Sequence, residues 1–225
     1  MSVGRAYRGM PQLTPEEAEL ERRLFREFED ILVELGFSYL SIPSSIRLDT
    51  MSRQFAEVFQ PRCVTTGDGY VLSGSAEQGI LEYFSGKEVS PGRYFAVNQC
   101  WREEPLYEGF IHCKEFRKIE QFVFCTPENW VREFALLLQI ASDFLTRHGL
   151  KWRIVDCTQE QGGYHVCKQD IEVWTDTYGW LETHSCTYFG DGQTSRFDIQ
   201  GNVHTISNTG LASPRILIPF LEKMK

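Results

Sequence analysis

The chain has 225 residues, a formal net charge of −8 and a hydrophobic fraction of 42%, which suits one large soluble domain or two small ones. The acidic balance argues against a general basic surface for nucleic acid, although it is compatible with a local basic patch. No apolar run is long enough to cross a bilayer, and the first residues lack the apolar stretch of a secretory signal. The seven cysteines are scattered, with no Cys-x-x-Cys pair, a pattern typical of thiols kept reduced in the cytoplasm.

The first elements have clear local signals. Residues 1–12 are expected to form an N-terminal arm, followed by a single domain over residues 13–225. The segment TPEEAELERRLFREFEDILVELG predicts a long helix, with Thr14 as its N-cap, Pro15 at the first position and Glu17 completing a capping box. Gly36 is a natural stop. The segment FSYLSIP then predicts a strand that ends at Pro43.

The rest of the chain predicts mostly strands. Residues 126–149 are expected to form a helix with Thr126 as its cap, and the C-terminal segment SPRILIPFLEKMK a helix capped by Ser213 and disturbed by Pro219. The segments KWRIVDC, QDIEVWTD, GWLETHSCTYF and SRFDIQ predict strands. Strands in succession, with helices grouped around them, favour an α+β fold in which helices flank an antiparallel sheet. The usual glycine-rich phosphate loops are absent from the sequence.

The segment from Asn98 to Phe124 predicts a hairpin with an unusual wall. Alternate residues of a strand share a face, so Phe116, Lys118 and Glu120 point the same way, with Arg102 opposite them. A charged side chain is costly in a protein interior unless it is paired. A wall of an arginine, a carboxylate and an aromatic ring therefore suggests a binding site.

Several segments, taken in order, resemble the class II aminoacyl-tRNA synthetases, and most closely their serine-specific branch. WREE…HCKEFRKIEQFVF is similar to the second signature motif of that family and NTGLASPRILIPFLE to the third. The helix from Thr14 with its following strand resembles the first motif, the dimerisation element. LSGSAEQGI is similar to the loop that holds the substrate serine. DCTQEQGGYHVCKQDIEVW and LETHSCTYFGDGQTSR resemble the stretches between the motifs.

The resemblance implies ATP and Mg²⁺ as cofactors and serine, or a related small amino acid, as substrate. Arg102 would hold the α-phosphate and the reacting carboxylate, Phe116 would stack on adenine and Arg215 would meet the pyrophosphate end. The implied ATP-binding set is Arg102, Glu104, His112, Phe116, Glu182 and Arg215. The implied catalytic residues are Arg102, Glu182 and Arg215, and Glu182 would also ligate magnesium. The implied amino-acid-binding set is Ser75, Glu77, Arg102, Glu120, Ser185 and Thr209.

Some positions depart from the family, and others have ordinary explanations. His112 stands where an arginine is usual, and a neutral imidazole neutralises less phosphate charge. Ser75 and Thr209 occupy positions where zinc-dependent relatives carry cysteines, so no active-site zinc is expected. Taken singly, Arg102 and Glu104 could form a surface ion pair, Phe116 could be core, and Glu182 and Arg215 could be solvated surface residues. Only their combined order favours the synthetase interpretation.

Three functions are compatible with the sequence. The first is an amino-acid-activating ligase that forms seryl-adenylate and passes the seryl group to a carrier protein, a small molecule or another non-tRNA acceptor. The second is a minimal serine-tRNA ligase, and the third a non-catalytic synthetase-like paralogue. We favour the first, because the coiled-coil arm with which seryl-tRNA synthetases grip tRNA is not evident and the loop over residues 105–115 looks short. A cytoplasmic homodimer is expected, without membrane attachment.

Overall fold

The computed structural model describes residues 5–55, 63–159 and 164–224. Its centre is a seven-stranded sheet in the order β3-β7-β8-β12-β11-β10-β9. Neighbouring strands are antiparallel except for β3 and β7, which run parallel. The strand bounds are β3 Ser38–Tyr39, β7 Gly92–Trp101, β8 Glu115–Cys125, β9 Trp152–Asp156, β10 Cys167–Thr175, β11 Gly179–Gly190 and β12 His204–Ser213. The predicted α+β class with an antiparallel sheet is confirmed.

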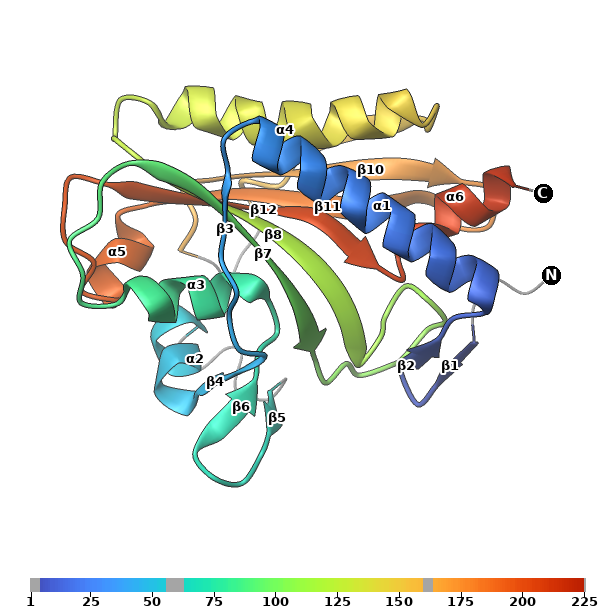
Figure 1. Cartoon of the computed structure of the whole chain (residues 1–225), viewed down its shortest axis with the longest axis horizontal. Coiled ribbons are helices and arrows are strands. Elements are labelled where there is room, and N and C mark those ends of the chain that lie inside the picture. The colour runs from blue at the N-terminus through green and yellow to red at the C-terminus, as the bar shows by residue number, and fades with distance from the viewer. Residues whose placement is uncertain (1–4, 56–62, 160–163, 225) are drawn as a thin grey trace.

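Helices cover both faces of this sheet (Figure 1). Helices α1 (Pro15–Glu34), α4 (Trp130–Arg147) and α6 (Leu217–Lys223) lie on one face, which we call the helix face. Helices α2 (Leu48–Phe55), α3 (Ala76–Phe84) and α5 (Gly192–Arg196) lie on the opposite side, where α3 packs on β7 and β8. We call that opposite surface of the sheet the site face.

Two small sheets complete the fold. Strands β1 (Arg5–Tyr7) and β2 (Met10–Gln12) form a hairpin within the predicted N-terminal arm. Strands β4 (Ser45–Arg47), β5 (Val64–Thr65) and β6 (Tyr70–Leu72) form a three-stranded sheet beside α2 and α3. No helix among the described residues is both long and apolar enough to cross a membrane.

The core on the helix face is the larger of the two. Phe28 of α1 is fully buried and meets Phe144 of α4 edge to face, with ring centroids 5.1 Å apart. Edge-to-face contacts are a preferred arrangement of aromatic pairs. Helix α1 begins as predicted, because the Thr14 hydroxyl accepts from the Glu17 amide and the Glu17 carboxylate accepts from the Thr14 amide. The capping box therefore fixes the helix whose apolar stripe covers the sheet.

Three predictions about elements are wrong: the starts of two helices and the existence of one strand. Helix α4 begins at Trp130 rather than after Thr126, because the Asn129 amide and side chain both bond back to Thr126 in a turn. The segment SRFDIQ is not a strand: it contains the end of α5 and then Asp198, whose φ of 52° is incompatible with a strand. Ser213 ends β12 instead of capping a helix.

Two smaller differences concern the ends of predicted elements. Helix α6 starts only at Leu217, so Pro219 lies in its first turn. The first turn makes no intrahelical use of its amide hydrogens, so the proline is tolerated there. The strand predicted over residues 37–43 is reduced to Ser38–Tyr39.

Bulges in β11 and β12 set which side chains reach the site face. In β12 the register shifts between Thr209 and Leu211, so that Thr209 lies opposite Glu120 and Leu211 opposite Ile119. The extra residue is Gly210. In β11 a similar shift lets Glu182 pair with Glu172, and Ser185 with Asp170. Because an extra residue reverses the alternation of a strand, Glu182 and Ser185 share the site face although they are three residues apart.

Candidate active site

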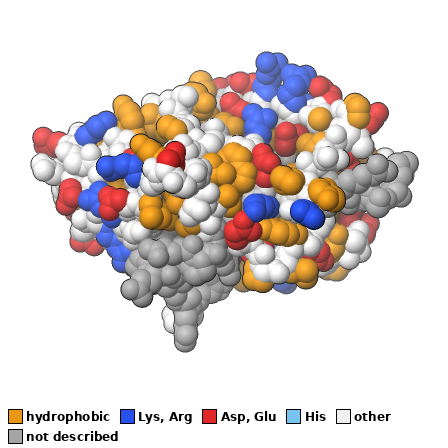
Figure 2. Space-filling view, turned by 90° about the horizontal axis from the view of Figure 1, so that it is seen from below, with side chains coloured by type: hydrophobic (Ala, Val, Ile, Leu, Met, Phe, Trp, Pro, Cys, Tyr) orange, Lys and Arg blue, Asp and Glu red, His pale blue; other side chains and the backbone are white. Residues whose placement is uncertain are grey.

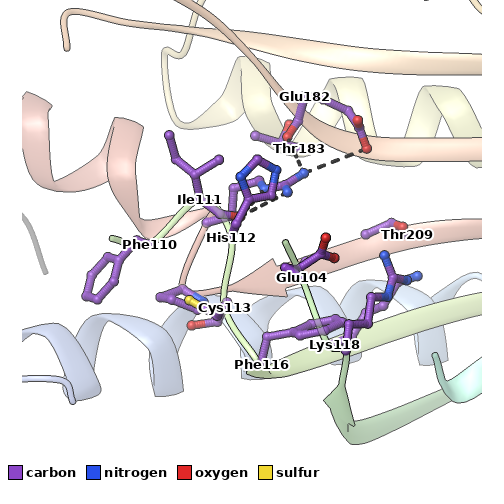
Figure 3. Close-up of a pocket in the computed structure, with 15 residues that line it drawn as sticks. Glu104, Phe110, Ile111, His112, Cys113, Phe116, Lys118, Glu182, Thr183 and Thr209 are labelled. Carbon is purple, nitrogen blue, oxygen red and sulfur yellow. Dashed lines mark hydrogen bonds and ion pairs between the residues drawn. The ribbon is translucent and has the colours of Figure 1, made fainter. Parts of the chain in front are cut away.

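A cleft opens on the site face between the β7–β8 hairpin and the ends of β11 and β12. Figure 3 shows its side chains, with Phe116 and Lys118 on one side and His112 and Glu182 on the other. Of the residues predicted from the sequence, the cleft is lined by Arg102, Glu104, His112, Phe116, Glu182, Thr209 and Arg215. The fold thus collects side chains from four separated segments, including both predicted phosphate-binding arginines.

Arg102 is held just beyond the end of β7. Its Nε donates to the Gly74 carbonyl at 3.1 Å, which ties it to the loop before α3. Its guanidinium lies over the Phe116 ring, 5.2 Å from the centroid. Cys100 and Phe116 are opposite one another in the β7–β8 register, so Phe116 lies next to the strand end that carries Arg102. A guanidinium over an aromatic face is a stabilising cation–π arrangement, and it fixes the direction in which Arg102 points.

Arg215 reaches the cleft from the turn between β12 and α6. Its Nε and one terminal nitrogen donate to the Ile111 carbonyl, at 3.1 and 2.9 Å. The other terminal nitrogen donates to the Glu182 carbonyl at 3.2 Å and lies 3.8 Å from the Glu182 carboxylate. Backbone carbonyls therefore orient this guanidinium between the β7–β8 loop and β11.

Glu182 is the carboxylate that could hold a divalent cation. Its side chain is half exposed, yet protein atoms crowd its carboxyl, and this desolvation raises its pKa against the opposing effect of Arg215. Within the described part of the chain, no three His, Cys, Asp or Glu side chains group together around a metal position. Magnesium commonly binds through one or two carboxylates together with substrate phosphates, so a single exposed carboxylate fits that role.

Below the cleft lies a second group of predicted residues. The Ser75 hydroxyl donates to Glu120 Oε2 at 3.0 Å and also accepts from the Glu77 amide at 3.4 Å as the N-cap of α3. Glu120 is almost fully buried and lies opposite Thr209 across the sheet. Lys118 Nζ is 2.5 Å from Glu120 Oε2 and 3.3 Å from the Ser75 oxygen. The buried charge of Glu120 is thus paired, as buried charges must be.

Glu77 is the most perturbed carboxyl of this group. It is only 7% exposed, and its carboxylate accepts from the Gln193 side chain of α5. Burial raises the pKa of Glu77 to about 7, and the nearby Glu120 adds to the effect, while Lys118, Gln193 and Gln54 oppose it. A buried carboxyl whose pKa lies near neutrality is typical of functional sites.

The remaining predicted residues are placed less centrally. Ser185 is half-buried on the site face of β11, opposite Asp170, and does not line the cleft. His112 lies on the loop that returns to β8, where its amide bonds back to Glu108. Glu104 lines the cleft beyond Arg102. Ser75, Glu77 and Glu120 lie below the cleft and do not line it.

Sequence reasoning gave Lys118 no role. Its side chain lines the cleft and is 7% exposed, and its ammonium lies between Ser75 and Glu120. The alternation of β8 had already placed it on the same face as Phe116 and Glu120. The shared face was therefore the sequence feature that could have identified Lys118 as a site residue.

Comparisons with known proteins identify the family of this chain. Residues 62–224 match the tRNA synthetase class II core domain (G, H, P, S and T). Among curated relatives, the serine–tRNA ligase of Deinococcus radiodurans is 34% identical over 93% of this chain and 55% of its own length. That of Caldicellulosiruptor bescii is 30% identical over 97% of this chain and 56% of its own length.

The fold is shared with solved synthetases. The seryl-tRNA synthetase of Pyrococcus horikoshii, solved with ATP, has a TM-score of 0.87 at 23% identity, covering 95% of this chain and 53% of its own. The cytoplasmic serine–tRNA ligase of Naegleria fowleri, solved with AMP, has a TM-score of 0.86 at 23% identity over 94% of this chain and 50% of its own. The chain spans about half the length of the curated relatives it matches. The match over most of its residues shows that this chain belongs to the class II tRNA synthetase core family.

Proposed function

We propose that this chain activates serine with ATP, forming seryl-adenylate and releasing pyrophosphate. The observation that carries the proposal is one cleft in which Arg102 and Arg215 face a carboxylate, Glu182, and an aromatic ring, Phe116. Directly beneath it, Glu120 and Ser75 offer acceptors for an ammonium and a hydroxyl. A non-catalytic paralogue has no need for both sets, so the arrangement favours an enzyme.

The chemistry needs positioning and charge neutralisation rather than a general base. The serine carboxylate is already an anion when it attacks the α-phosphorus, and pyrophosphate leaves with the P–O bond electrons. The transition state gathers negative charge on phosphate oxygens, and fixed cations aimed at that charge supply much of the catalysis. Arg102 would meet the α-phosphate and carboxylate, and Arg215 the departing end. Glu182 would hold magnesium, which neutralises phosphate charge when bound.

The substrate preference rests on the residues below the cleft. Glu120, which is nearly fully buried, and the Ser75 hydroxyl present acceptors for the amino acid, and Thr209 adds a hydroxyl from β12. A buried site built to pair a substrate hydroxyl rejects the analogue without it by about 10⁴-fold or more. Serine should therefore be preferred over alanine.

The test is amino-acid-dependent ATP–pyrophosphate exchange with each common amino acid in turn. Exchange with serine, lost in both Arg102→Ala and Glu120→Ala, is the expected result. A folded chain that binds ATP but exchanges with no amino acid would contradict serine activation. A folded chain that neither exchanges nor binds ATP would favour the non-catalytic paralogue.

The acceptor of the seryl group is a separate question. The relatives named above are serine–tRNA ligases, so tRNA has their support as acceptor, whereas a carrier protein has none from them. Lys/Arg and Asp/Glu side chains are interspersed on the face seen in Figure 2, without one continuous basic field among the atoms that are coloured. Incubating the chain with labelled serine, ATP and either tRNA or a phosphopantetheinyl carrier protein separates the two.

We also propose a homodimer through the first-motif elements, α1 and β3. Exposed hydrophobic side chains gather at the end of α1 and on β3, namely Val33, Leu35 and Tyr39. Their burial against a second copy would remove apolar surface from water. Light scattering of the purified chain should give twice the chain mass.

The seven thiols suit the reducing cytoplasm as the place of action.

A further inference from the structure

The ammonium group of Lys118 lies between two acceptors that the proposed function gives to the substrate. Its Nζ is 2.5 Å from Glu120 Oε2 and 3.3 Å from the Ser75 oxygen. These are the carboxylate and the hydroxyl proposed to hold the ammonium and the hydroxyl of serine. Lys118 and the amino acid therefore offer the same chemical group to the same partners, at a site that is almost closed to water.

Two ammonium groups cannot share this position. Like charges within a few ångströms repel strongly in a poorly solvated environment, and Glu120 Oε2 already accepts from Ser75 and Lys118. At Glu120 Oε2, the ammonium of serine therefore competes with the ammonium of Lys118. A lysine is well suited to give way, because its charge sits at the end of a flexible four-carbon stem.

The cleft offers Lys118 a second place for its charge. Its side chain lines the same cleft as Arg102 and Thr209. Burial raises the pKa of the Cys100 thiol, opposite Phe116, to about 12, and the nearby Lys118 and Arg102 oppose that shift. Both cations therefore act at the same point, the end of the β7–β8 hairpin that borders the cleft. Under the proposed function, that point is where the serine carboxylate meets the α-phosphate.

Under the proposed function, this part of the cleft must neutralise the negative charge of the α-phosphate. His112 occupies the loop position where the resemblance leads one to expect an arginine, and a neutral imidazole contributes less to phosphate neutralisation. Arg215 is committed to the far side by its bonds to Ile111 and its contact with Glu182. Arg102 is therefore the cation fixed on the near side, and a mobile lysine beside it would complement it.

We propose that Lys118 is an exchangeable cation of the active site: it neutralises Glu120 before the amino acid binds, and the ammonium of serine then displaces it toward the carboxylate and the α-phosphate. This inference rests on the proposed serine activation. Lys118 would also contribute to substrate specificity, because only a ligand with its own ammonium can replace the lysine at Glu120. The same inference makes Lys118 a contributor to neutralisation of the transition state.

The two roles predict opposite changes in two kinetic constants. Lys118→Met keeps the length of the side chain but removes its charge. At pH 8 the uncompensated Glu120 should accept serine more readily, so KM for serine should fall, by about threefold or more. The lost phosphate cation should lower kcat of the exchange reaction by about 100-fold. A fall in both constants is the signature of a removed competitor that also served the transition state.

Two further variants complete the design. Lys118→Arg keeps the charge and should retain kcat within about tenfold of the wild-type value, while Lys87→Met, which removes an exposed lysine stacked on Tyr83, should change neither constant. Thermal unfolding checks that each variant is folded. If Lys118→Met does not fold, NMR of the lysine Nζ groups in the wild-type chain tests the proposal instead. The Lys118 signal is assigned by its absence from the spectrum of Lys118→Arg. Serine should then move one lysine signal, and alanine amide or ethanolamine, which carry the ammonium without the carboxylate, should move the same one.

The outcomes separate the two proposals. A rise in KM with kcat intact, or constants matching those of Lys87→Met, would overturn the role of Lys118 while leaving serine activation in place. A lysine signal at the site that serine leaves unmoved would do the same. Failure of the wild-type chain to exchange with any amino acid would instead overturn the proposed function.

Discussion

Replacing Glu77 by glutamine should stabilise the protein at alkaline pH and not at acidic pH. Glu77 is 7% exposed, and its pKa is raised from 4.5 to about 7 by burial and by the neighbouring Glu120. Between these two values the folded chain keeps a proton that the unfolded chain has lost. The free energy of unfolding therefore falls as pH rises through this window. Over the whole window, from below pH 4.5 to above pH 7, the free energy of unfolding falls by roughly 3 kcal/mol.

Glutamine removes this pH-dependent loss of stability because its side chain does not ionise. Its amide oxygen can still accept from the Gln193 side chain. Gln54, which donates to the carboxylate in the wild type, can turn its amide so that its oxygen, which has no partner among the described residues, accepts from the new NH₂ group. Glu77→Gln should therefore match the wild type near pH 5 and exceed it at pH 8 by up to about 3 kcal/mol. The pKa of about 7 already includes the opposing effect of Lys118, which favours the ionised form.

Urea unfolding at pH 5 and pH 8 measures the effect directly. Glu34→Gln, at the exposed end of α1, is the matched control and should shift the two curves equally. If the wild type and Glu77→Gln lose stability in parallel between pH 5 and 8, the carboxyl does not hold its proton, and the reasoning from burial is refuted. Lower stability of the variant at pH 8 would refute it as well.

Three further predictions concern the aromatic wall, the β12 bulge and a buried histidine. Phe116→Ala should raise KM for ATP more than KM for serine, since loss of base stacking costs about 1–3 kcal/mol and Arg102 keeps its bond to the Gly74 carbonyl; equal changes in both would point to collapse of the wall. Gly210→Ala should lower the free energy of unfolding by about 1–3 kcal/mol, because the added Cβ would come within 2.7 Å of Phe28 and 3.3 Å of the Ile119 carbonyl; an unchanged urea midpoint would contradict this. His184 is fully buried, which lowers its pKa to about 4. Because the unfolded chain then binds more protons below pH 6.5, acid should destabilise the wild type as pH falls from 6.5 toward 4, and His184→Gln should flatten that limb of the curve.

Sequence reasoning succeeded where local chemistry decides the structure. Helix α1 was predicted from Thr14, Pro15 and Glu17, whose side chains and backbone interact within one turn. The shared face of Phe116, Lys118 and Glu120 followed from the alternation of a single strand, as the β7–β8 register shows. In both cases the information lies within a few neighbouring residues.

It failed where partners distant in the chain decide. Ser213 looks like a helix cap, yet it pairs with Arg117 at the end of β12. The misplaced helix start at Thr126 is a separate, local error, because a turn between Thr126 and Asn129 delays the helix to Trp130. Strand β12 itself was not predicted, because its small residues around Gly210 carry little strand signal and its pairing with β8 is nonlocal. The position of Lys118 between Ser75 and Glu120 likewise depends on how the loop before α3 meets β8.

The bulge at Gly210 also limits how the length of this chain can vary. Beyond it, Ala212 rather than Leu211 lies on the cleft side, and Arg215 follows at a fixed spacing. Deleting one residue between Thr205 and Thr209, with the bulge at Gly210 kept, would reverse the alternation, so that the strand before the bulge and Leu211 beyond it could not both keep their present faces. Sequence alignments should therefore place no gap in this stretch. Chimaeras made with relatives should be joined in surface loops such as residues 126–129, where a change of length leaves the phase of the strand intact.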